Sequence, residues 1–286
     1  MAVQEDRLPP PASVPGDVER TEDLRVLLEV AESAARAGGS LVLEGAGRAR
    51  PEEKAAGDYV TEVDRASERE IAAVLREATP RIPILGEESA GSGPWLGGSG
   101  GRSWVVDPLD GTTNFLHGFP AVGVSVGLVE DRRPVVGVVH APFLGTTYVG
   151  ATGLGARAVG ADGSSRPLGV SGLDPGRAVV GTGFPFRRKD LLPRYLEAME
   201  ACLRRFEDLR RPGAASLDLA WVAAGVFEGF FELALSPWDV AAGAVLIQEA
   251  GGVVTDWDGG PGYLSGDILA GSPAVHAALL ELVRET

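Results

Sequence analysis

Residues 104–115 have the sequence WVVDPLDGTTNF, and they decide the fold expected around them. The apolar start, residues 104–106, predicts a β-strand, so Asp107 stands where that strand ends. Asp110 shares the tight turn that follows, and Gly111 allows close approach of the backbone to another group. The amides beyond the glycine begin a helical turn, where an anion is favoured. The stretch therefore brings two carboxylates and a candidate phosphate site to one strand end.

Two further acidic clusters have the same character, GEES at residues 86–89 and PWD at residues 237–239. Hard divalent ions such as Mg²⁺ prefer oxygen ligands, and two neighbouring ions need about three or four converging carboxylates. Taken singly, Glu87 fits a solvated turn and Asp239 fits a helix cap. The combination of the three clusters favours a metal site.

Composition sets limits on the function. The chain has 286 residues, 44% of them apolar, which suffices for a substantial core. Its formal charge of −14 argues against a broad surface for nucleic acid or anionic membrane, and it repels anionic substrates unless cations intervene. The single Cys202 cannot form an internal disulfide, and no apolar run approaches the roughly 20 residues of a membrane span. These features predict a cytoplasmic protein.

The periodicity of apolar residues predicts a mixed α/β chain after a disordered tail at residues 1–20. Helices are expected from residue 21 to a stop at Gly38 and Gly39, and over residues 67–78, 191–206, 217–224, 240–250 and 273–283. Strands are expected over residues 82–85, 104–106, 122–129, 135–139, 146–149, 178–182, 227–233 and 253–256. The short polar connection at residues 130–134 predicts a hairpin.

The three acidic motifs, in this order and separation, resemble the inositol monophosphatase family of metal-dependent, lithium-sensitive phosphatases. Further matches are DYVTEVD at residues 58–64, GTGFPF at residues 181–186 and GAASLDLAWVAAGVFEGFFEL at residues 213–233. The resemblance covers about residues 21–283 and is closest to the bacterial inositol-1-monophosphatases.

The resemblance implies an αβαβα layered sandwich of the sugar phosphatase type, within the α/β (α+β) class. A large antiparallel sheet is expected in an N-terminal part, residues 21–165, that carries most metal ligands. A smaller mixed sheet is expected in a C-terminal part, residues 166–286, that supplies Asp239 and substrate contacts. Family members usually form homodimers.

The resemblance also implies two or three Mg²⁺ ions. Glu87, Asp107 and the carbonyl of Leu109 would bind one ion. Asp107, Asp110 and Asp239 would bind a second, so that Asp107 bridges the two. Bound ions would neutralise the phosphate and lower the pKa of a water molecule, so no protein nucleophile is required.

The remaining roles follow from the same resemblance. Asp58 and Thr112 match the pair that activates the attacking water, while Glu62 and Asp64 are expected to be surface or capping residues. The implied substrate contacts are Gly111, Thr112, Asp110, Ala215 and Glu232.

The expected activity is hydrolysis of a small phosphate monoester, with inositol monophosphate favoured. Histidinol phosphate, fructose 1,6-bisphosphate and 3′-phosphoadenosine 5′-phosphate stay open as alternatives. A haloacid-dehalogenase-type site is disfavoured because its two aspartates lie two positions apart, whereas Asp107 and Asp110 are three apart. A regulatory protein that binds the transcription machinery is the alternative of another class, with a small basic patch at Arg204, Arg205, Arg210 and Arg211.

Overall fold

The structure is a computed structural model that describes residues 15–55, 58–89, 101–186 and 188–285. Its larger sheet has seven strands that are neighbours in chain order, antiparallel except for the parallel first pair. They are β3 (Ile84–Gly86), β4 (Arg102–Asp110), β5 (Gly123–Glu130), β6 (Arg133–Ala141), β7 (Thr146–Ala151), β8 (Gly155–Gly160) and β9 (Ser165–Pro167). The five strands expected before residue 150 all belong to this sheet, whereas β8 and β9 were not predicted.

The predicted hairpin joins β5 to β6. Glu130 pairs with Arg133, and the two residues between them, Asp131 and Arg132, have φ angles of 47° and 67°. Two successive residues with positive φ are typical of the tight turns whose twist matches that of the flanking strands.

The smaller sheet is mixed, with strand order β11-β10-β12-β14-β13. β10 is parallel to β11 and β12, and β14 is antiparallel to both of its neighbours. The strands are β10 (Val179–Thr182), β11 (Asp208–Arg210), β12 (Gly229–Glu232), β13 (Val253–Thr255) and β14 (Ile268–Gly271). A separate two-stranded ribbon consists of β1 (Glu52–Ala55) and β2 (Asp58–Val60).

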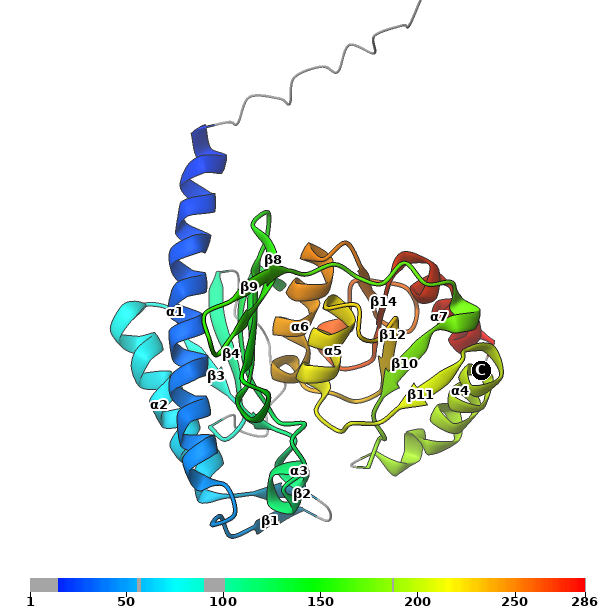
Figure 1. Ribbon diagram of the computed structural model, residues 1–286, viewed down its shortest axis with the longest axis horizontal. Coiled ribbons are helices and arrows are strands. Elements are labelled where there is room, and N and C mark those ends of the chain that lie inside the picture. Colours follow the sequence, from blue (N-terminus) through cyan, green and yellow to red (C-terminus); the bar gives the residue numbers. More distant parts are fainter. Residues whose placement is uncertain (1–14, 56–57, 90–100, 187, 286) are drawn as a thin grey trace, which may run out of the picture.

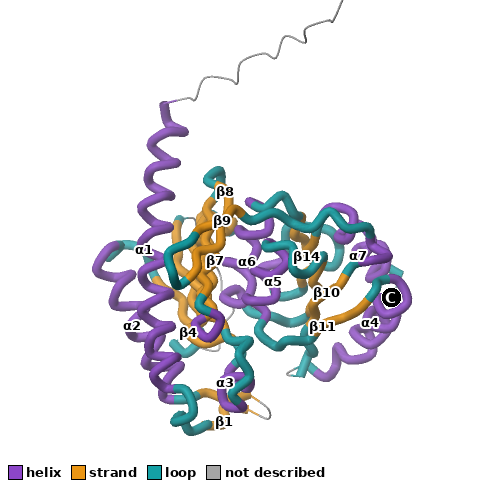
Figure 2. The backbone as a smooth tube through the Cα atoms, viewed as in Figure 1, coloured by secondary structure: helices purple, strands orange, loops and turns teal. Residues whose placement is uncertain are grey.

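Seven α-helices lie among the described residues and complete the layers. They are α1 (Pro15–Gly45), α2 (Glu62–Ala78), α3 (Thr112–His117), α4 (Leu192–Arg205), α5 (Ala215–Ala223), α6 (Pro237–Glu249) and α7 (Pro273–Arg284). Helices α1 and α2 cover the outer face of the seven-stranded sheet, α5 and α6 lie between the sheets, and α4 and α7 cover the far face of the second sheet (Figure 1). Figure 2 shows the strands of the two sheets separated by α5 and α6. The predicted αβαβα sandwich is therefore confirmed.

The central helices are apolar almost all round because both of their faces are covered. Residues 240–247 of α6 are all buried, and so are residues 215–220 of α5. A Cβ atom at Gly137 of β6 would lie 2.9 Å from the Cα atom of Ala242, so the glycine lets α6 rest directly on the first sheet. This close contact positions the N-terminal end of α6, which carries Asp239.

Helix α1 does not stop at the glycine pair, and that prediction was wrong. A Cβ at Gly38 would lie 2.7 Å from the side chain of Ile71 in α2, and one at Gly39 would collide with the ring of His140 in β6. The two glycines are therefore points of close packing inside the helix. Packing against α2 and the sheet compensates for their low helix propensity, which single-sequence periodicity cannot reveal.

The boundary of the predicted tail also needs correction. Residues 1–14 lie outside the described part of the chain, but residues 15–20 already belong to α1. Arg20 forms an ion pair of 2.5 Å with Glu130 at the end of β5, and Asp23 forms one of 2.5 Å with Arg102 at the start of β4. These contacts tie the polar first turns of the helix to the sheet.

The division into parts at residues 165 and 166 stays a prediction. The seven-stranded sheet ends at Pro167 and the second sheet begins at Val179, yet α5 and α6 from the later half pack on the first sheet as well. Among the described residues, no helix combines the length and apolar character that a membrane crossing requires.

Candidate active site

Glu87 directly follows β3, and Asp107 lies in the parallel neighbouring strand β4, one residue beyond the pairing of the two strands. The last residue of β3 pairs with Val106 of β4, and the amide of Glu87 donates to the Val106 carbonyl at 3.0 Å. Since the carboxyl ends of parallel strands meet at one sheet edge, the two acids emerge together. Glu68 of α2 stabilises the turn after β3, because its Oε2 accepts a hydrogen bond from the Glu88 amide at 2.7 Å.

A bulge at the end of β4 arranges the next acids. Asp107 pairs with Ser125 and Asp110 with Gly123, so two residues of β4 stand where β5 has one. A bulge of this kind redirects side chains and ends the strand pairing. The amide of Leu109 donates to Oδ1 of Asp107 at 3.0 Å, and Ser67 donates to the Pro108 carbonyl at 2.9 Å. The turn is thus fixed by a hydrogen bond within it, from Leu109 to Asp107, and by a second one from Ser67 of α2.

Asp110 reaches the N-terminal end of α5. Its Oδ2 accepts from the amide and the hydroxyl of Ser216, at 2.8 and 2.6 Å. The exposed amides of a helix N-terminus favour a negative charge. These bonds join residues 106 positions apart and connect the end of the first sheet to the middle helical layer.

Asp239 comes from the first turn of α6. It forms a capping box with Ser236, whose amide donates to Oδ2 of Asp239 at 2.7 Å. The helix start is held to the first sheet because Ser125 of β5 donates to the carbonyl of Trp238 at 2.8 Å. The cap anticipated from the sequence is therefore present, in the same carboxylate that faces the cluster.

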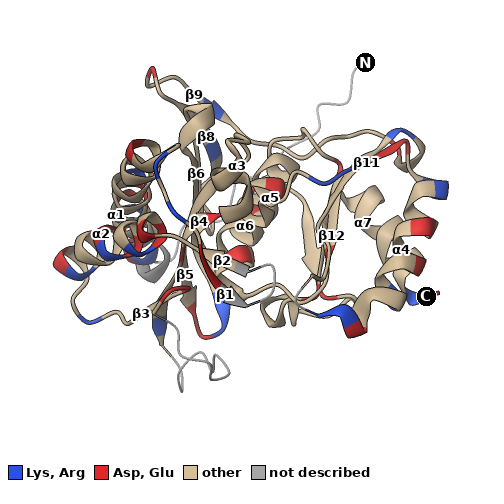
Figure 3. Ribbon diagram, turned by 90° about the horizontal axis from the view of Figure 1, so that it is seen from below, with Lys and Arg blue, Asp and Glu red and all other residues tan. Residues whose placement is uncertain are grey.

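The three aspartates form one compact group. Asp107, Asp110 and Asp239 each offer a carboxylate oxygen, and these oxygens all lie within 4.8 Å of one another. Figure 3 shows acidic residues in the central part of the view, near β4 and α6. Asp107 is buried, with 2% of its surface exposed, whereas Asp110 and Asp239 are partly buried.

Crowding changes the acidity of this group. Burial, followed by the charges of Glu87, Asp110 and Asp239, raises the pKa of Asp107 well above its usual value. Burial, followed by the charge of Asp239, raises the pKa of Asp110 to about 7, although the bonds from Ser216 act in the opposite direction. For Asp107 and Asp110 the structure shows no ion pair with a described Lys or Arg. A donor set of converging carboxylate oxygens fits a hard divalent ion, which would relieve this repulsion.

Thr112 pairs with Asp64, whereas the predicted pairing with Asp58 falls on a side chain outside the described part of the structure. The Thr112 hydroxyl lies 3.2 Å from Oδ1 of Asp64 and 3.3 Å from the carbonyl of Leu109. Asp58 begins β2, and its side chain lies outside what the structure describes. Asp64 is not a surface residue, because only 1% of its surface is exposed.

Asp64 is also a capping residue, as the sequence analysis expected. Its Oδ2 accepts from the amide of Thr61 at 2.9 Å and from the Thr61 hydroxyl at 2.5 Å, which caps α2. Burial raises the pKa of Asp64, and the bonds from Thr61 and Thr112 oppose that rise. The capping-box spacing, a Thr followed three residues later by an acid, was the available signal that placed this residue at a helix start.

The acids open into a cleft of about 630 Å³, a size typical of small-molecule sites. It is lined by all the metal-ligand candidates and all the predicted substrate contacts: Glu87, Asp107, Leu109, Asp110, Gly111, Thr112, Ala215, Glu232 and Asp239. Gly111 precedes α3 with a φ of 90°, and a Cβ there would lie 2.9 Å from the Ala121 carbonyl, so the turn requires glycine. The predicted site residues thus line one cleft. Within that cleft, the aspartate cluster is the feature that indicates a chemistry, namely metal binding.

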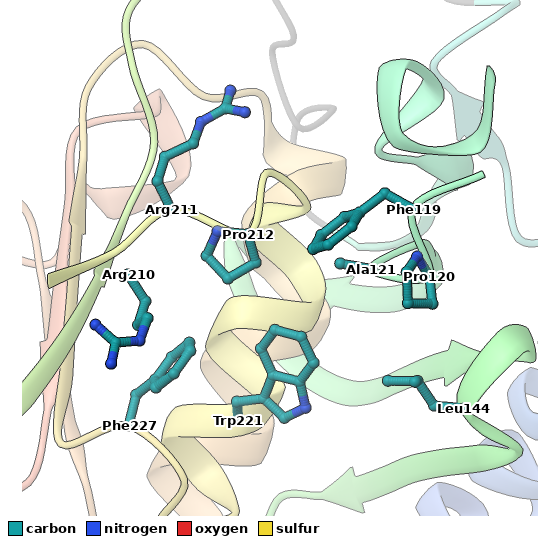
Figure 4. A pocket seen from close by; sticks show the side chains of 9 residues that line it. All are labelled: Phe119, Pro120, Ala121, Leu144, Arg210, Arg211, Pro212, Trp221 and Phe227. Atoms are coloured by element: carbon teal, nitrogen blue, oxygen red, sulfur yellow. The ribbon is translucent and has the colours of Figure 1, made fainter. Parts of the chain in front are cut away.

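A second hollow adjoins this cleft. It has a volume of about 330 Å³ and an apolar lining that includes Phe119, Trp221 and Phe227 (Figure 4). No titratable cluster lies in it among the described residues, so it is no candidate for the chemistry.

Comparison with known proteins agrees with this geometry. The sequence profile of the inositol monophosphatase family matches residues 23–286. Nus factor SuhB of Pseudomonas aeruginosa is 43% identical over 271 residues, which cover 91% of this chain and 97% of that protein. Fructose-1,6-bisphosphatase/inositol-1-monophosphatase of Aquifex aeolicus is 40% identical over 267 residues, covering 92% and 97%. The crystal structure of extragenic suppressor protein suhB from Bartonella henselae superposes with a TM-score of 0.82 at 33% identity, covering 91% of this chain and 98% of that one.

Proposed function

Because the chain belongs to the inositol monophosphatase family, we propose that it is a Mg²⁺-dependent phosphatase of small phosphate monoesters, with inositol monophosphate as its preferred substrate. The observation that carries the proposal is the convergence of Asp107, Asp110 and Asp239 within 4.8 Å beside Glu87 in one cleft. A purely structural cluster of this kind would be destabilising, because each carboxylate raises the cost of ionising the others.

In this proposal two or three Mg²⁺ ions are held by Glu87, Asp107, the Leu109 carbonyl, Asp110 and Asp239. When bound, the ions neutralise the substrate phosphate and make a water nucleophile available near neutral pH. The strand ends and the two helix starts fix their carboxylates in advance, so little reorganisation is required on binding. Such preorganisation is the main contribution of a protein to phosphoryl transfer.

Asp64 and Thr112 orient the attacking water. The carboxylate of Asp64 is held by Thr61 at one oxygen and receives the Thr112 hydroxyl at the other. With its proton directed to Asp64, the Thr112 oxygen is left as an acceptor for a water proton. The pair thereby assigns to Asp64 the role that the sequence resemblance assigned to Asp58.

The amides of Gly111 and Thr112 are proposed to hold the phosphate, and Asp110, Ala215 and Glu232 to face the alcohol. Glu232 ends β12 on the opposite side of the cleft from β4. A carboxylate there can accept bonds from the hydroxyl groups of a polyol, which supports inositol as the alcohol.

Phosphate release from a panel of monoesters tests the proposal. Inositol 1-phosphate, histidinol phosphate, fructose 1,6-bisphosphate and 3′-phosphoadenosine 5′-phosphate are each supplied with Mg²⁺, with a chelator, and with Mg²⁺ plus Li⁺. We expect hydrolysis only with Mg²⁺, fastest for inositol 1-phosphate, and inhibition by Li⁺. Hydrolysis that persists in the chelator would refute the metal assignment.

A regulatory role is the second candidate, because several similar proteins bear the name Nus factor SuhB. The basic patch considered for such a role is weak in the structure. Arg204 pairs with Glu200 at 2.6 Å, Arg210 with Asp208 at 2.5 Å, and the Arg211 guanidinium lies over aromatic rings. Co-purification with RNA polymerase by a variant without phosphatase activity would favour this role.

The proposed enzyme acts in the cytoplasm as a homodimer. Its one cysteine, Cys202, is buried, and burial raises the pKa of its thiol to about 12, consistent with an inert structural thiol. Light scattering coupled to size exclusion would give the mass in solution, and a monomer would refute the dimer.

A further inference from the structure

Two phenylalanines form an aromatic wall of the catalytic cleft. Phe184 and Phe186 line it with 37% and 54% of their surfaces exposed, and their rings meet edge to face with centroids 5.6 Å apart. Phe184 also contacts the buried Tyr195 edge to face at 5.8 Å, and Tyr195 stacks on Phe231 of β12 at 5.9 Å. The wall is thus anchored in the core under the second sheet.

An arginine lies against this wall. The guanidinium carbon of Arg211 is 5.1 Å from the ring centroid of Phe184 and 5.1 Å from that of Phe186. Within the described part of the chain, no hydrogen bond or ion pair engages its guanidinium N–H groups. By contrast, the neighbouring Arg188 is bound to Asp190 by two bonds of 3.0 and 2.7 Å.

The Arg211 side chain faces the catalytic cleft. A Cβ at Gly213 would lie 2.7 Å from Nη1 of Arg211 and 3.4 Å from the amide nitrogen of Asn114, so the guanidinium lies above the loop that leads into α5. That helix begins with the residues that bind Asp110. Arg211 lines both the cleft and the apolar hollow, and Figure 4 shows its guanidinium extending to the side away from Trp221, whereas Arg210 extends beside Phe227.

We propose that Arg211, held against Phe184 and Phe186, is a specificity-determining residue that binds the second phosphate group of a bisphosphate, so that the cleft accepts such compounds in addition to inositol monophosphate. This inference rests on the proposed phosphatase function. The scissile phosphate would be neutralised by the ions, so the arginine is not needed there. A guanidinium held against two rings by its charge can still offer N–H groups to the oxygens of a phosphate.

The charge of the surroundings supports this assignment. The protein carries a formal charge of −14, and the lining of the cleft includes Glu87, Glu232 and the three clustered aspartates. An unpaired cation in such a place would ordinarily form an ion pair with a nearby acid. Arg211 instead lies over uncharged rings, and Lys189, which also lines the cleft, adds a second positive charge.

The test compares fructose 1,6-bisphosphate with fructose 1-phosphate, which differ only in the second phosphate. We expect Arg211→Gln to lower kcat/KM for the bisphosphate by about tenfold or more, mainly through KM, and to change the monophosphate by less than about twofold. Arg211→Lys should retain only part of the preference, because it keeps the charge without the planar fork.

Arg188→Gln is the matched control, since it removes the same charge from the lining of the same cleft but from a guanidinium already bound to Asp190. We expect it to leave both compounds within about twofold of the wild type. Equal losses on both compounds in Arg211→Gln, or the same selective loss in Arg188→Gln, would overturn the inference.

If the wild type released phosphate from neither compound, the proposed function would fail for this class while the inference would still be decided by binding. Calorimetric titration would then be expected to show tighter binding of the bisphosphate to the wild type than to Arg211→Gln. Equal affinities would refute it. Thermal unfolding of each variant verifies that it is folded.

Discussion

Replacement of Asp64 by Asn separates a catalytic role from a structural one. Asp64 accepts Thr61 at Oδ2 and Thr112 at Oδ1, so both oxygens act as acceptors in a buried place. Asn has the same shape but only one acceptor oxygen, and its NH₂ group must therefore face one of the two threonines. Either the cap of α2 or the orientation of the Thr112 hydroxyl is lost.

The magnitude follows from the bond that is lost. A hydrogen bond to a charged group contributes about 1.5–3 kcal/mol, which corresponds to roughly 10–100-fold in rate if it acts only in the transition state. General-base assistance reaches about 10²–10⁴-fold. We therefore expect Asp64→Asn to lower kcat by about 100-fold with KM and the Mg²⁺ requirement nearly unchanged.

Thr61→Ala supplies the control. It removes the hydroxyl that accepts from the amides of Val63 and Asp64, at 3.0 and 3.4 Å, and that donates to Oδ2 of Asp64. The Thr61 amide still donates to that oxygen, and the Thr112 contact at Oδ1 stays in place. The loss of a cap costs about 0.5–2 kcal/mol, which lowers the melting temperature by about 2–4 °C per kcal/mol. We expect Thr61→Ala to lose stability as Asp64→Asn does, while its kcat stays within about threefold of the wild type.

The assay is phosphate release from inositol 1-phosphate at saturating Mg²⁺, combined with thermal unfolding of each variant. Thr112→Ala and the double variant Asp64→Asn with Thr112→Ala should lose kcat to the same extent as Asp64→Asn alone. Equal kcat losses in Thr61→Ala and Asp64→Asn would show that Asp64 acts only through the helix start. Multiplication of the two single losses in the double variant would show that Asp64 and Thr112 work independently.

Three further predictions concern the acids of the cleft. Asp107→Asn should abolish turnover with Mg²⁺ while raising the melting temperature of the metal-free protein, because one buried charge among repelling neighbours is removed; near-normal activity would refute the metal assignment. In a chelator, calorimetry should show stability falling from pH 5 to pH 8: burial raises the pKa of Asp110 from 3.8 to about 7, so between these values the unfolded chain has released a proton that the folded protein still holds. Mg²⁺ should reverse this slope since it binds the ionised acids, and a flat profile in the chelator would contradict the reasoning. Glu232→Gln should lower kcat/KM for inositol 1-phosphate far more than for a plain aryl phosphate, and equal losses would place Glu232 in the general catalytic machinery or the fold.

The strands of the site were predictable from the sequence. Apolar residues directly before Asp107 required a strand, and the structure has one there, but β4 continues past Asp107 through a bulge to Asp110. The early beginning of α2 was missed because residues 62–66 are mostly polar and show no apolar periodicity. Their helix is started by the Thr61 and Asp64 cap, a local pattern that periodicity does not weigh.

The pairing of Thr112 with Asp64, which we propose activates the water, could not be derived from spacing. Asp58 and Asp64 are both acids of one short motif, and only the fold decides which of them meets a threonine 48 positions along the chain. Likewise, the bond from Ser216 to Asp110 joins two turns with no signal in either, since serine at a helix start is ordinary. Contacts between distant segments depend on how α5 packs between the sheets, and that packing is a property of the whole chain.

The long reach of the site has a consequence for synthesis of the protein. Asp110 is held by Ser216. Ser125 donates to the carbonyl of Trp238, which lies 113 positions later and directly precedes Asp239. A nascent chain that has formed the complete first sheet therefore still lacks Ser216, the partner of Asp110, and Asp239, the third aspartate of the cluster. On the ribosome, the three aspartates can meet only after residue 239 has left the exit tunnel, so the ion proposed to lie among all three would secure a finished protein but could not nucleate an unfinished one.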